Sequence, residues 1–351
     1  MADVNRPCRE RDMPIRATLD TDCAALLAEL GLAMPGDDPA VTPLNGGVSS
    51  EVARVDVAGR SYCLKFALAK LKVKEDWFAP VDRNRTEYTW LRIAAEILPG
   101  NALVTYGRSE RLNGFAMEYI SGPDNYLWKD RLLSAGIDLD DARAVGGNLG
   151  KLHKVSARPG FDRSGLSNAR DFRSLRIEPY LHFSAQAHPA QAPALERIAR
   201  GLEAADGALI HGDASPKNII FRPTGPVLLD AECATMGDPA FDPAFCMNHL
   251  VLKAVHLPGH RRAMLAGAAA LWDAYAEHVD WEPRAAVEAR TAELLPALML
   301  ARIDGKSPVE YLTDAHRRLV RGLALSLLDT PDATIPALLG RIASNLETHP
   351  T

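Results

Sequence analysis

The chain has 351 residues, of which 47% are hydrophobic and 24% are charged, and its formal net charge is -5. These values describe a globular protein long enough for two domains, and they argue against the basic surface that nucleic-acid binding requires. No apolar run approaches the roughly 18 residues that cross a bilayer, and the N-terminal residues lack the apolar core of a signal peptide. Five cysteines form no C-x-x-C pair, so neither a disulfide framework nor a zinc site is expected. We therefore expect a cytoplasmic protein without nucleic-acid or membrane partners.

The N-terminal part is predicted to begin with a short helix over residues 20–32, because apolar side chains recur there at helical spacing. The glycine-rich turn LNGGVSSEV follows. Its Gly46 and Gly47 permit close backbone approach, and its Ser49 and Ser50 add hydrogen-bond donors, as a turn that covers phosphate needs. A plain hairpin turn has the same composition, so both interpretations stay open.

Residues 52–57 and 61–67 are predicted to form a hairpin. In its second strand Lys65 shares a face with the small side chains of Cys63 and Ala67, which leaves room for a purine. A lysine in an otherwise apolar strand needs a buried partner. The candidate is Glu87 in a helix predicted over residues 83–98, because it lies on the apolar face of that helix. The alternative is a lysine and a glutamate that both face water.

The connection between Lys65 and this helix is longer than a simple loop, and long ordered loops are commonly functional. It contains Trp77 next to Phe78. An exposed tryptophan is unusual unless it covers something. Two hypotheses remain: Trp77 packs permanently on the first lobe, or it belongs to a lid that closes over nucleotide and acceptor and excludes water.

The stretch from Ala208 to Phe245 carries the strongest chemical signal. Three short apolar runs, residues 208–210, 219–221 and 227–229, are predicted to be buried strands. Four polar residues lie on the short loops beside them: Asp213, Asn218, Asp230 and Glu232. An aspartate can accept a hydroxyl proton, and amide and carboxylate oxygens are hard ligands for magnesium. The joint spacing therefore suits metal-assisted phosphoryl transfer.

This stretch resembles the aminoglycoside phosphotransferase and choline kinase family, which has the protein-kinase-like fold. The resemblance rests on His211-Gly212-Asp213, Asn218, Asp230-Ala231-Glu232, Gly237-Asp238-Pro239 and Asp242. It implies that Asp213 is the catalytic base, that Asn218 and Asp230 bind magnesium, and that Glu232 reaches a metal directly or through water. It also implies that Asp242 anchors the catalytic loop from a following helix. His211 is expected to hydrogen-bond backbone and to shape the loop.

The same resemblance assigns roles to the first lobe. The Lys65 and Glu87 pair resembles the kinase lysine and helix glutamate that orient nucleotide phosphates. The strand predicted over residues 114–120 would lead into the hinge between the lobes, where Met117 backs the purine pocket. The main chain of Glu118, Tyr119 and Ile120 would then bond the purine edge. The long connection up to Glu87 resembles that of methylthioribose kinases more than that of aminoglycoside enzymes, which favours a sugar-like acceptor.

The remaining chain is predicted to be mostly helical. A helix over residues 141–155 contains Gly146, Gly147 and Gly150, which would let another element approach closely. Four more helices are predicted over residues 260–278, 284–302, 308–328 and 335–346, on the substrate side of the second lobe. Arg302 lies at a break between two of them. It is either a helix-end charge in solvent or a contact to the substrate.

Together these features predict an α+β, two-lobed protein-kinase-like fold. A small antiparallel β-sheet lobe that binds nucleotide would span residues 1–120, and a larger, mostly α-helical lobe would span residues 121–351. The predicted function is Mg²⁺-dependent transfer of the γ-phosphoryl group of ATP to a hydroxyl of a small molecule, either sugar-like or an amino alcohol. The alternatives are an aminoglycoside phosphotransferase that confers antibiotic resistance, and a catalytically silent nucleotide-binding pseudokinase. Residues 158–200 hold seven arginines, which does not suit a polycationic antibiotic. The sequence names neither the acceptor nor the oligomeric state.

Overall fold

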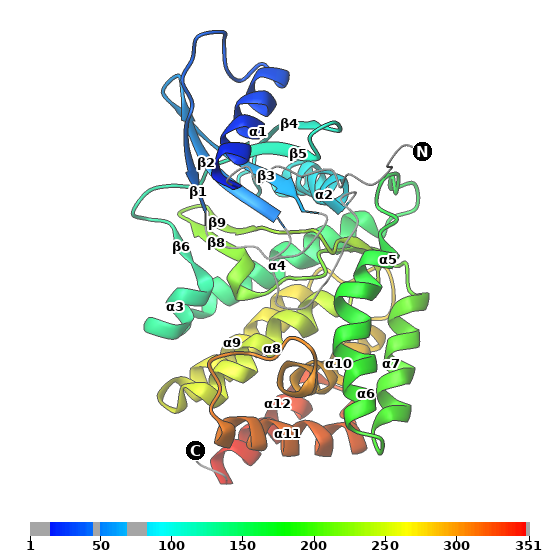
Figure 1. The fold of residues 1–351 in the computed structure, drawn as a ribbon. Helices are drawn as coiled ribbons and strands as arrows, with labels where there is room; N and C mark the ends of the chain where they lie inside the picture. Colours follow the sequence, from blue (N-terminus) through cyan, green and yellow to red (C-terminus); the bar gives the residue numbers. More distant parts are fainter. Residues whose placement is uncertain (1–14, 45–49, 69–82, 349–351) are drawn as a thin grey trace, which may run out of the picture. The chain divides into compact units, whose positions relative to one another are not determined.

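The computed structural model describes residues 15–44, 50–68 and 83–348 (Figure 1). The chain forms two compact units. The first comprises Met1–Val81 and Thr105–Tyr119, and the second comprises Asp82–Val104 and Ile120–Thr351. The second boundary, after Tyr119, falls in the segment predicted to be the hinge. Residues 82–104, which the sequence analysis assigned to the first lobe, group with the second unit.

The first unit is built on a five-stranded antiparallel sheet with the strand order β1-β2-β3-β5-β4. Its strands are β1 (Ala40–Pro43), β2 (Ser50–Val57), β3 (Arg60–Ala67), β4 (Thr105–Ser109) and β5 (Gly114–Glu118). The predicted hairpin is thus present as β2 and β3. One helix, α1 (Ile15–Glu29), belongs to the same unit and begins five residues earlier than the predicted helix.

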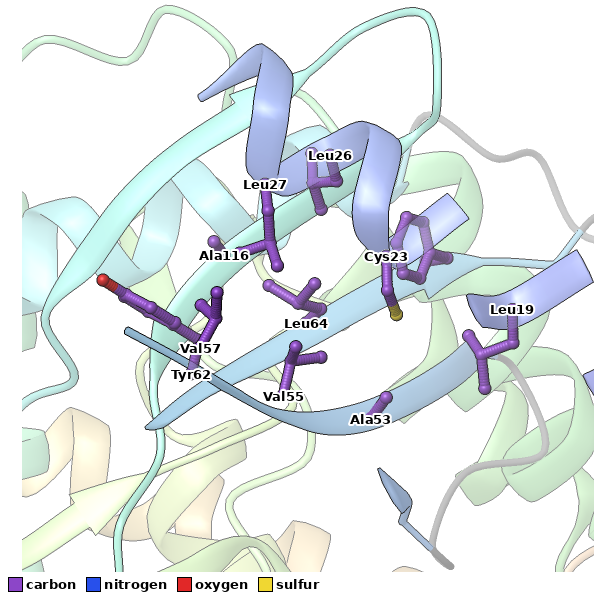
Figure 2. Packing of buried hydrophobic residues seen from close by; sticks show 11 residues of the cluster. Leu19, Cys23, Leu26, Leu27, Ala53, Val55, Val57, Tyr62, Leu64 and Ala116 are labelled. Atoms are coloured by element: carbon purple, nitrogen blue, oxygen red, sulfur yellow. The ribbon is translucent and has the colours of Figure 1, made fainter. Parts of the chain in front are cut away.

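The alternating side chains of the sheet give its two faces different roles. Tyr62, Leu64 and Phe66 of β3 point to the face that α1 covers, where they pack with Leu26 and Leu27 in one hydrophobic core (Figure 2). Burying a side chain of this size contributes about 1.5–3 kcal/mol. The intervening residues of β3 therefore lie on the opposite face.

The second unit is mostly helical and contains two small sheets, β6-β8-β9 and β7-β10. Its strands are β6 (Tyr126–Leu127), β7 (Ala208–Ile210), β8 (Ile219–Arg222), β9 (Gly225–Leu228) and β10 (Thr235–Gly237). Its helices are α2 (Arg83–Ile97), α3 (Trp128–Ser134), α4 (Leu139–Ser156), α5 (Ala169–Phe172), the π-helix η1 (Arg173–His182), α6 (Phe183–Ala187), α7 (Ala192–Ala204), α8 (Phe241–His256), α9 (Arg261–Ala276), α10 (Arg284–Asp304), α11 (Asp314–Asp329) and α12 (Ile335–Thr348), with 3₁₀ turns η2 (Pro216–Asn218) and η3 (Pro258–His260).

Helix α8 is the structural centre of this unit, because it packs against both α9 and α10 and is buried along almost its whole length. Its many apolar residues favour this central place, and its polar residues Asp242, Asn248, His249 and Lys253 are buried with them. Helix α4 packs closely along α9. A Cβ atom on Gly146 would lie 2.0 Å from the Leu271 carbonyl oxygen, and one on Gly150 would lie 2.8 Å from that of Tyr275. Two of the three glycines predicted to permit close approach therefore do so.

Most of the predicted helices are present with shifted ends. The helix predicted over residues 308–328 begins only at Asp314, because the Thr313 side chain caps it by accepting from the His316 backbone N–H at 3.2 Å. Residues 158–189, for which no helix was predicted, contain α5, η1 and α6. Pro179 hid this segment, since proline is unfavourable inside an α-helix. None of the helices formed by the described residues is long and apolar enough to cross a membrane.

Candidate active site

The predicted catalytic loop connects β7 to β8, and one carboxylate holds its backbone through hydrogen bonds. Asp242, in the first turn of α8, accepts from the backbone N–H of His211 at 2.6 Å and of Gly212 at 2.9 Å. Gly212 has a φ of +75°, and a Cβ atom there would lie 2.6 Å from the Cys233 carbonyl oxygen. Only glycine fits this turn without strain. The loop anchor implied by the resemblance therefore has its contacts in the structure.

His211 uses both of its ring nitrogens to hold backbone groups. Its Nδ1 atom accepts from the Asp213 backbone N–H at 3.1 Å, so Nε2 carries the proton and donates to the Leu229 carbonyl oxygen at 3.0 Å. The Trp90 ring packs edge-on against it at 4.8 Å. Burial lowers the pKa of His211, which keeps the ring neutral. The side chain thus ties the end of β9 to the loop and has no nitrogen left to move a proton.

A second histidine, His153, also contacts Asp242, and no sequence pattern predicted this contact. His153 of α4 is buried, and its Nε2 atom lies 3.1 Å from Oδ2 of Asp242. Its Nδ1 atom lies 2.9 Å from the Tyr275 hydroxyl, which donates to the Pro239 carbonyl oxygen at 2.9 Å. Both imidazole nitrogens are therefore engaged, and His153 connects the Asp242 carboxylate to the Tyr275 hydroxyl.

Asp242 is ionised in this setting. Burial would raise its pKa, but the hydrogen bond and charge of His153 and the His211 contacts outweigh burial and hold the pKa below its ordinary value. Both carboxylate oxygens of Asp242 accept a hydrogen bond from the backbone of the loop. The anchor is consequently rigid, because shifting the loop would leave a buried charge without its partners.

Asp213 lies between two cations and an amide. Its Oδ2 atom is 3.0 Å from Nη2 of Arg176, 3.2 Å from Nζ of Lys217 and 2.9 Å from Nδ2 of Asn218. Burial alone would raise the pKa of Asp213, but the charges of Arg176 and Lys217 hold it below the ordinary value. The carboxylate is therefore ionised at neutral pH. It can orient a hydroxyl group and accept its proton late in a reaction.

Arg176 comes from the π-helix η1, a rare geometry that is found frequently at functional sites. Besides Asp213, its guanidinium donates from Nε to the Gly212 carbonyl oxygen at 2.6 Å. It lies 5.6 Å from the ring centre of Phe245 and 5.9 Å from that of Tyr180. This arginine fixes both the backbone and the carboxylate of the loop. The sequence analysis did not identify it because 36 residues separate it from Gly212.

The predicted metal ligands lie at the neighbouring strand ends. The Leu229 backbone N–H donates to the Asn218 carbonyl oxygen at 2.8 Å, which holds the start of β8 beside the residues that follow β9. The Asn218 amide nitrogen donates to Asp213 at both the backbone and the side chain, so its amide oxygen points elsewhere. Asp230 has a φ of +64°, a strained conformation for a residue other than glycine. Such strain is concentrated at functional sites.

Glu232 lies next in the chain but is already engaged by an arginine. Its Oε2 atom is 3.2 Å from Nε of Arg83, a fully buried guanidinium at the start of α2. Within the described residues, no group of three or more His, Cys, Asp or Glu side chains could hold a metal by itself. Magnesium that binds with a nucleotide needs only one or two carboxylates, because phosphates and water complete its shell. Asn218 and Asp230 supply hard oxygens and fit that requirement.

The first unit carries most of the residues predicted to bind nucleotide, whereas Glu87 and Ile120 belong to the second unit. Lys65 is buried, and its register partners are Val52 on β2 and Phe115 on β5. Cys63 and Met117 are register partners on the same face. That face is opposite to the one covered by α1, so three of the predicted nucleotide residues share one side of the sheet.

The other residues predicted to bind nucleotide or substrate lie in the first unit, in the second unit or outside the described residues. Ser50 is buried in β2, and the Tyr119 ring lies 4.9 Å from the guanidinium of Arg54. Glu87 is buried on α2, and Glu118 ends β5 before Tyr119 and Ile120. The predicted Lys65–Glu87 ion pair joins residues that belong to the two different units and stays a prediction. Gly46, Gly47, Ser49 and Trp77 lie outside the described residues.

Comparison with known proteins places this architecture among kinase-like phosphotransferases. The sequence profile of the phosphotransferase enzyme family, APH, matches residues 40–278. The chain belongs to this family and is a small-molecule phosphotransferase that acts on a hydroxyl group. The resemblance found in the sequence is thereby confirmed. A search of curated protein sequences finds no significant match.

Solved kinase structures align with this chain at low sequence identity, and one of them exceeds a TM-score of 0.5. Amicoumacin kinase hAmiN, solved with AMP-PNP, Ca²⁺ and Ami, aligns with a TM-score of 0.54 at 12% identity, over 92% of this chain and 98% of that chain. The streptomycin-ATP-APH(2'')-IIa ternary complex aligns with a TM-score of 0.46 at 15% identity, over 93% and 99%. Choline kinase LicA from Streptococcus pneumoniae gives 0.45 at 15% identity, over 96% and 100%. The predicted α+β protein-kinase-like fold is confirmed.

Proposed function

We propose that this chain transfers the γ-phosphoryl group of ATP to a hydroxyl of a sugar-like or amino-alcohol acceptor. The carrying observation is the arrangement at Asp213: an ionised carboxylate on an anchored loop, hydrogen-bonded by the Asn218 amide at 2.9 Å. A phosphoryl transfer needs little covalent chemistry from the protein, so catalysis depends on positioning and charge. A rigid carboxylate beside metal-ligand oxygens meets both needs.

In this proposal Asp213 accepts a hydrogen bond from the acceptor hydroxyl and orients its oxygen toward the γ-phosphorus. A bond forms between that oxygen and phosphorus, the bond from phosphorus to the β-phosphate oxygen breaks, and ADP leaves. The hydroxyl proton passes to Asp213. Arg176 and Lys217 keep the carboxylate ionised beforehand. The low pKa makes Asp213 a weak base, which suits a proton that moves late in a loose transition state.

Asn218 and Asp230 would hold Mg²⁺, which when bound neutralises charge on the phosphate oxygens. Glu232 would act through water or by positioning Arg83, since its carboxylate already contacts that guanidinium. Lys65, Cys63 and Met117, on the face of the sheet opposite to α1, would receive the nucleotide, with the lobes divided near residue 120. The amicoumacin kinase solved with AMP-PNP shares this fold, which makes ATP the first donor to test.

The test is a transfer screen with radiolabelled ATP and Mg²⁺ over sugars, thio-sugars, amino alcohols and aminoglycosides. We expect label in at least one acceptor, and none when Mg²⁺ is chelated. An enzyme that neither transfers nor hydrolyses phosphate from MgATP would be the catalytically silent alternative. Preferential labelling of aminoglycosides would replace the proposed acceptor class.

A further inference from the structure

A group of cations gathers beside the proposed catalytic loop and is not explained by phosphoryl transfer alone. We call it the basic cluster; it consists of Lys129 of α3, Lys217 of η2, Lys253 of α8 and Arg302 of α10. All four charges act on the buried His249 of α8. Its pKa lies well below the ordinary value, first because of burial and then because of these four cations. Four separate elements thus contribute a positive charge near His249.

Two members of the basic cluster have carboxylate partners and two do not. Lys129 lies 3.3 Å from Oε1 of Glu310, and Lys217 lies 3.2 Å from Oδ2 of Asp213. Within the described part of the chain, no carboxylate lies at ion-pair distance from Lys253 or Arg302. The cluster therefore carries an excess of positive charge.

Lys253 makes this excess costly. Its side chain is only 2% exposed, and its ammonium group lies 5.3 Å from the ring centre of Tyr311. Burial, followed by the charges of Lys129 and Arg302, lowers its pKa to about 8. An isolated charge in such a place is unfavourable because burial removes its hydration. A bound anion would remove this cost.

Neighbouring polar atoms are also left without partners. Nε of Arg302 and the Tyr311 hydroxyl are buried, and neither has a hydrogen-bond partner among the described residues. The Arg302 Nη1 atom contacts the Tyr180 hydroxyl at 3.2 Å and the Ser307 hydroxyl at 2.8 Å, so the guanidinium is held in place while its buried Nε–H has no acceptor among the described residues. Buried donors normally find an acceptor. These donors are the kind that a carboxylate or phosphate group accepts.

Helix α8 links this cluster to the proposed catalytic base. Phe245, His249 and Lys253 are spaced by four residues and so share one face of the helix. Phe245 contacts Arg176, which contacts Asp213 at 3.0 Å. From Phe245 to Lys253 the helix rises about 12 Å. The contacts of Asp213 and the basic cluster therefore lie along one face of α8.

We propose that Lys253 and Arg302, with Lys129 and Tyr311 beside them, form an anion subsite, and that the acceptor is a hydroxylated small molecule bearing a carboxylate or a phosphate group. This inference rests on the proposed function, because it concerns the acceptor of the same site. It separates this chain from enzymes that take cationic acceptors such as choline, since an ammonium group would be repelled here.

The test measures binding to the full chain by calorimetry, with matched probes. The probes are glucose, glucosamine, gluconate and glucose 6-phosphate, together with glycerol, glycerate, glycerol 3-phosphate and choline. We expect at least one anionic probe to bind about tenfold or more tightly than its neutral and cationic counterparts, as one charge-assisted contact allows. The carboxylate and phosphate arms identify which group the subsite takes. Equal or weaker binding of every anion overturns the proposal.

Lys253→Met supplies the residue-level test, since methionine keeps the length of the side chain and removes the charge. It should weaken the preferred anion about 10- to 100-fold and leave the neutral probe unchanged. Lys151→Met, which removes an exposed charge of α4, is the matched control and should change neither. Unchanged anion affinity in Lys253→Met would also overturn the assignment. The wild-type panel decides the question even if this variant fails to fold.

Phosphate transfer in the same panel separates this inference from the proposed function. Anions that bind without being phosphorylated by MgATP would keep the subsite and refute the proposed function. A neutral or cationic acceptor phosphorylated without anion binding would keep the proposed function and refute the subsite.

Discussion

The catalytic loop and the basic cluster adjoin each other in the same unit, but they treat charge in opposite ways. Asp213 of the loop contacts Arg176, and Asp242, which holds the loop from α8, contacts His153. In the cluster, Lys253 is buried and has no carboxylate partner among the described residues. A buried charge with a partner is stabilised within the chain, whereas a buried charge without a carboxylate partner lowers stability. The proposed anion subsite differs from the catalytic loop in this respect.

The largest loss of activity is expected from substitution of the proposed metal ligands. Asp230→Ala should reduce turnover below detection and remove magnesium-dependent nucleotide binding, because phosphate charge would no longer be neutralised there. Asn218→Ala should be milder, since the amide carries no charge. Nucleotide affinity measured with and without Mg²⁺ checks this. Unchanged magnesium dependence in Asp230→Ala would move the metal site elsewhere.

The anchor provides the second prediction. Asp242→Ala should lower the free energy of unfolding by about 3–5 kcal/mol, because the buried backbone N–H groups of His211 and Gly212 and the His153 ring lose their partner, at about 1–3 kcal/mol for each group. Asp280→Ala is the matched control. Asp280 also contacts two cations, Lys154 at 2.9 Å and Arg158, but it is 38% exposed, so its loss should cost clearly less stability than the loss of Asp242. Denaturant titration measures both, and equal losses would contradict the account of the anchor.

The third and smallest effect has the opposite sign. Lys253→Met should raise the free energy of unfolding at neutral pH by about 1–2 kcal/mol, since it removes a buried charge. The folded-state pKa of about 8 lies below the ordinary value of 10.5, so wild-type stability rises with pH between these values. The advantage of the variant should be complete below pH 8 and vanish above 10.5. The groups that face Lys253 are Lys129, Arg302, Glu310 and Cys246.

Thermal melts of wild type and Lys253→Met across pH 6–11 measure this difference. A destabilised variant would mean that Lys253 has a structural partner, and the contrast between the two regions would fail. The same melts with the preferred anionic probe should stabilise the wild type more than the variant, because ligand binding to the folded state adds stability.

The sequence predicted the loop better than the cluster for a physical reason. Asp213, Asn218 and Asp230 lie within 18 residues of one another, flanked by short strands whose apolar runs are easily recognised. The basic cluster draws on α3, η2, α8 and α10, so its members meet only through tertiary packing. Arg302 was a candidate from its position at a helix end, but nothing local indicated Lys253. The π-helix that supplies Arg176 contains Pro179, which argued against a helix there.

His153 of α4, which contacts the loop anchor Asp242, is a second residue whose role depends on tertiary packing. A histidine near the end of an apolar helix is ordinarily a packing residue, and its partner Asp242 lies 89 positions away. Only the packing of α4 against α9, allowed by Gly146 and Gly150, brings it beneath the catalytic loop beside Tyr275.

The most direct test of the proposed function compares turnover and nucleotide affinity in Asp213→Asn. With the best acceptor from the transfer screen, we expect kcat to fall by about 10²- to 10⁴-fold, the scale of a lost general base. The Kd for ATP should stay within about twofold of wild type, because in this proposal the side chain contacts the acceptor hydroxyl. Retained turnover, or a loss of ATP binding equal to the loss of turnover, would contradict the role of Asp213.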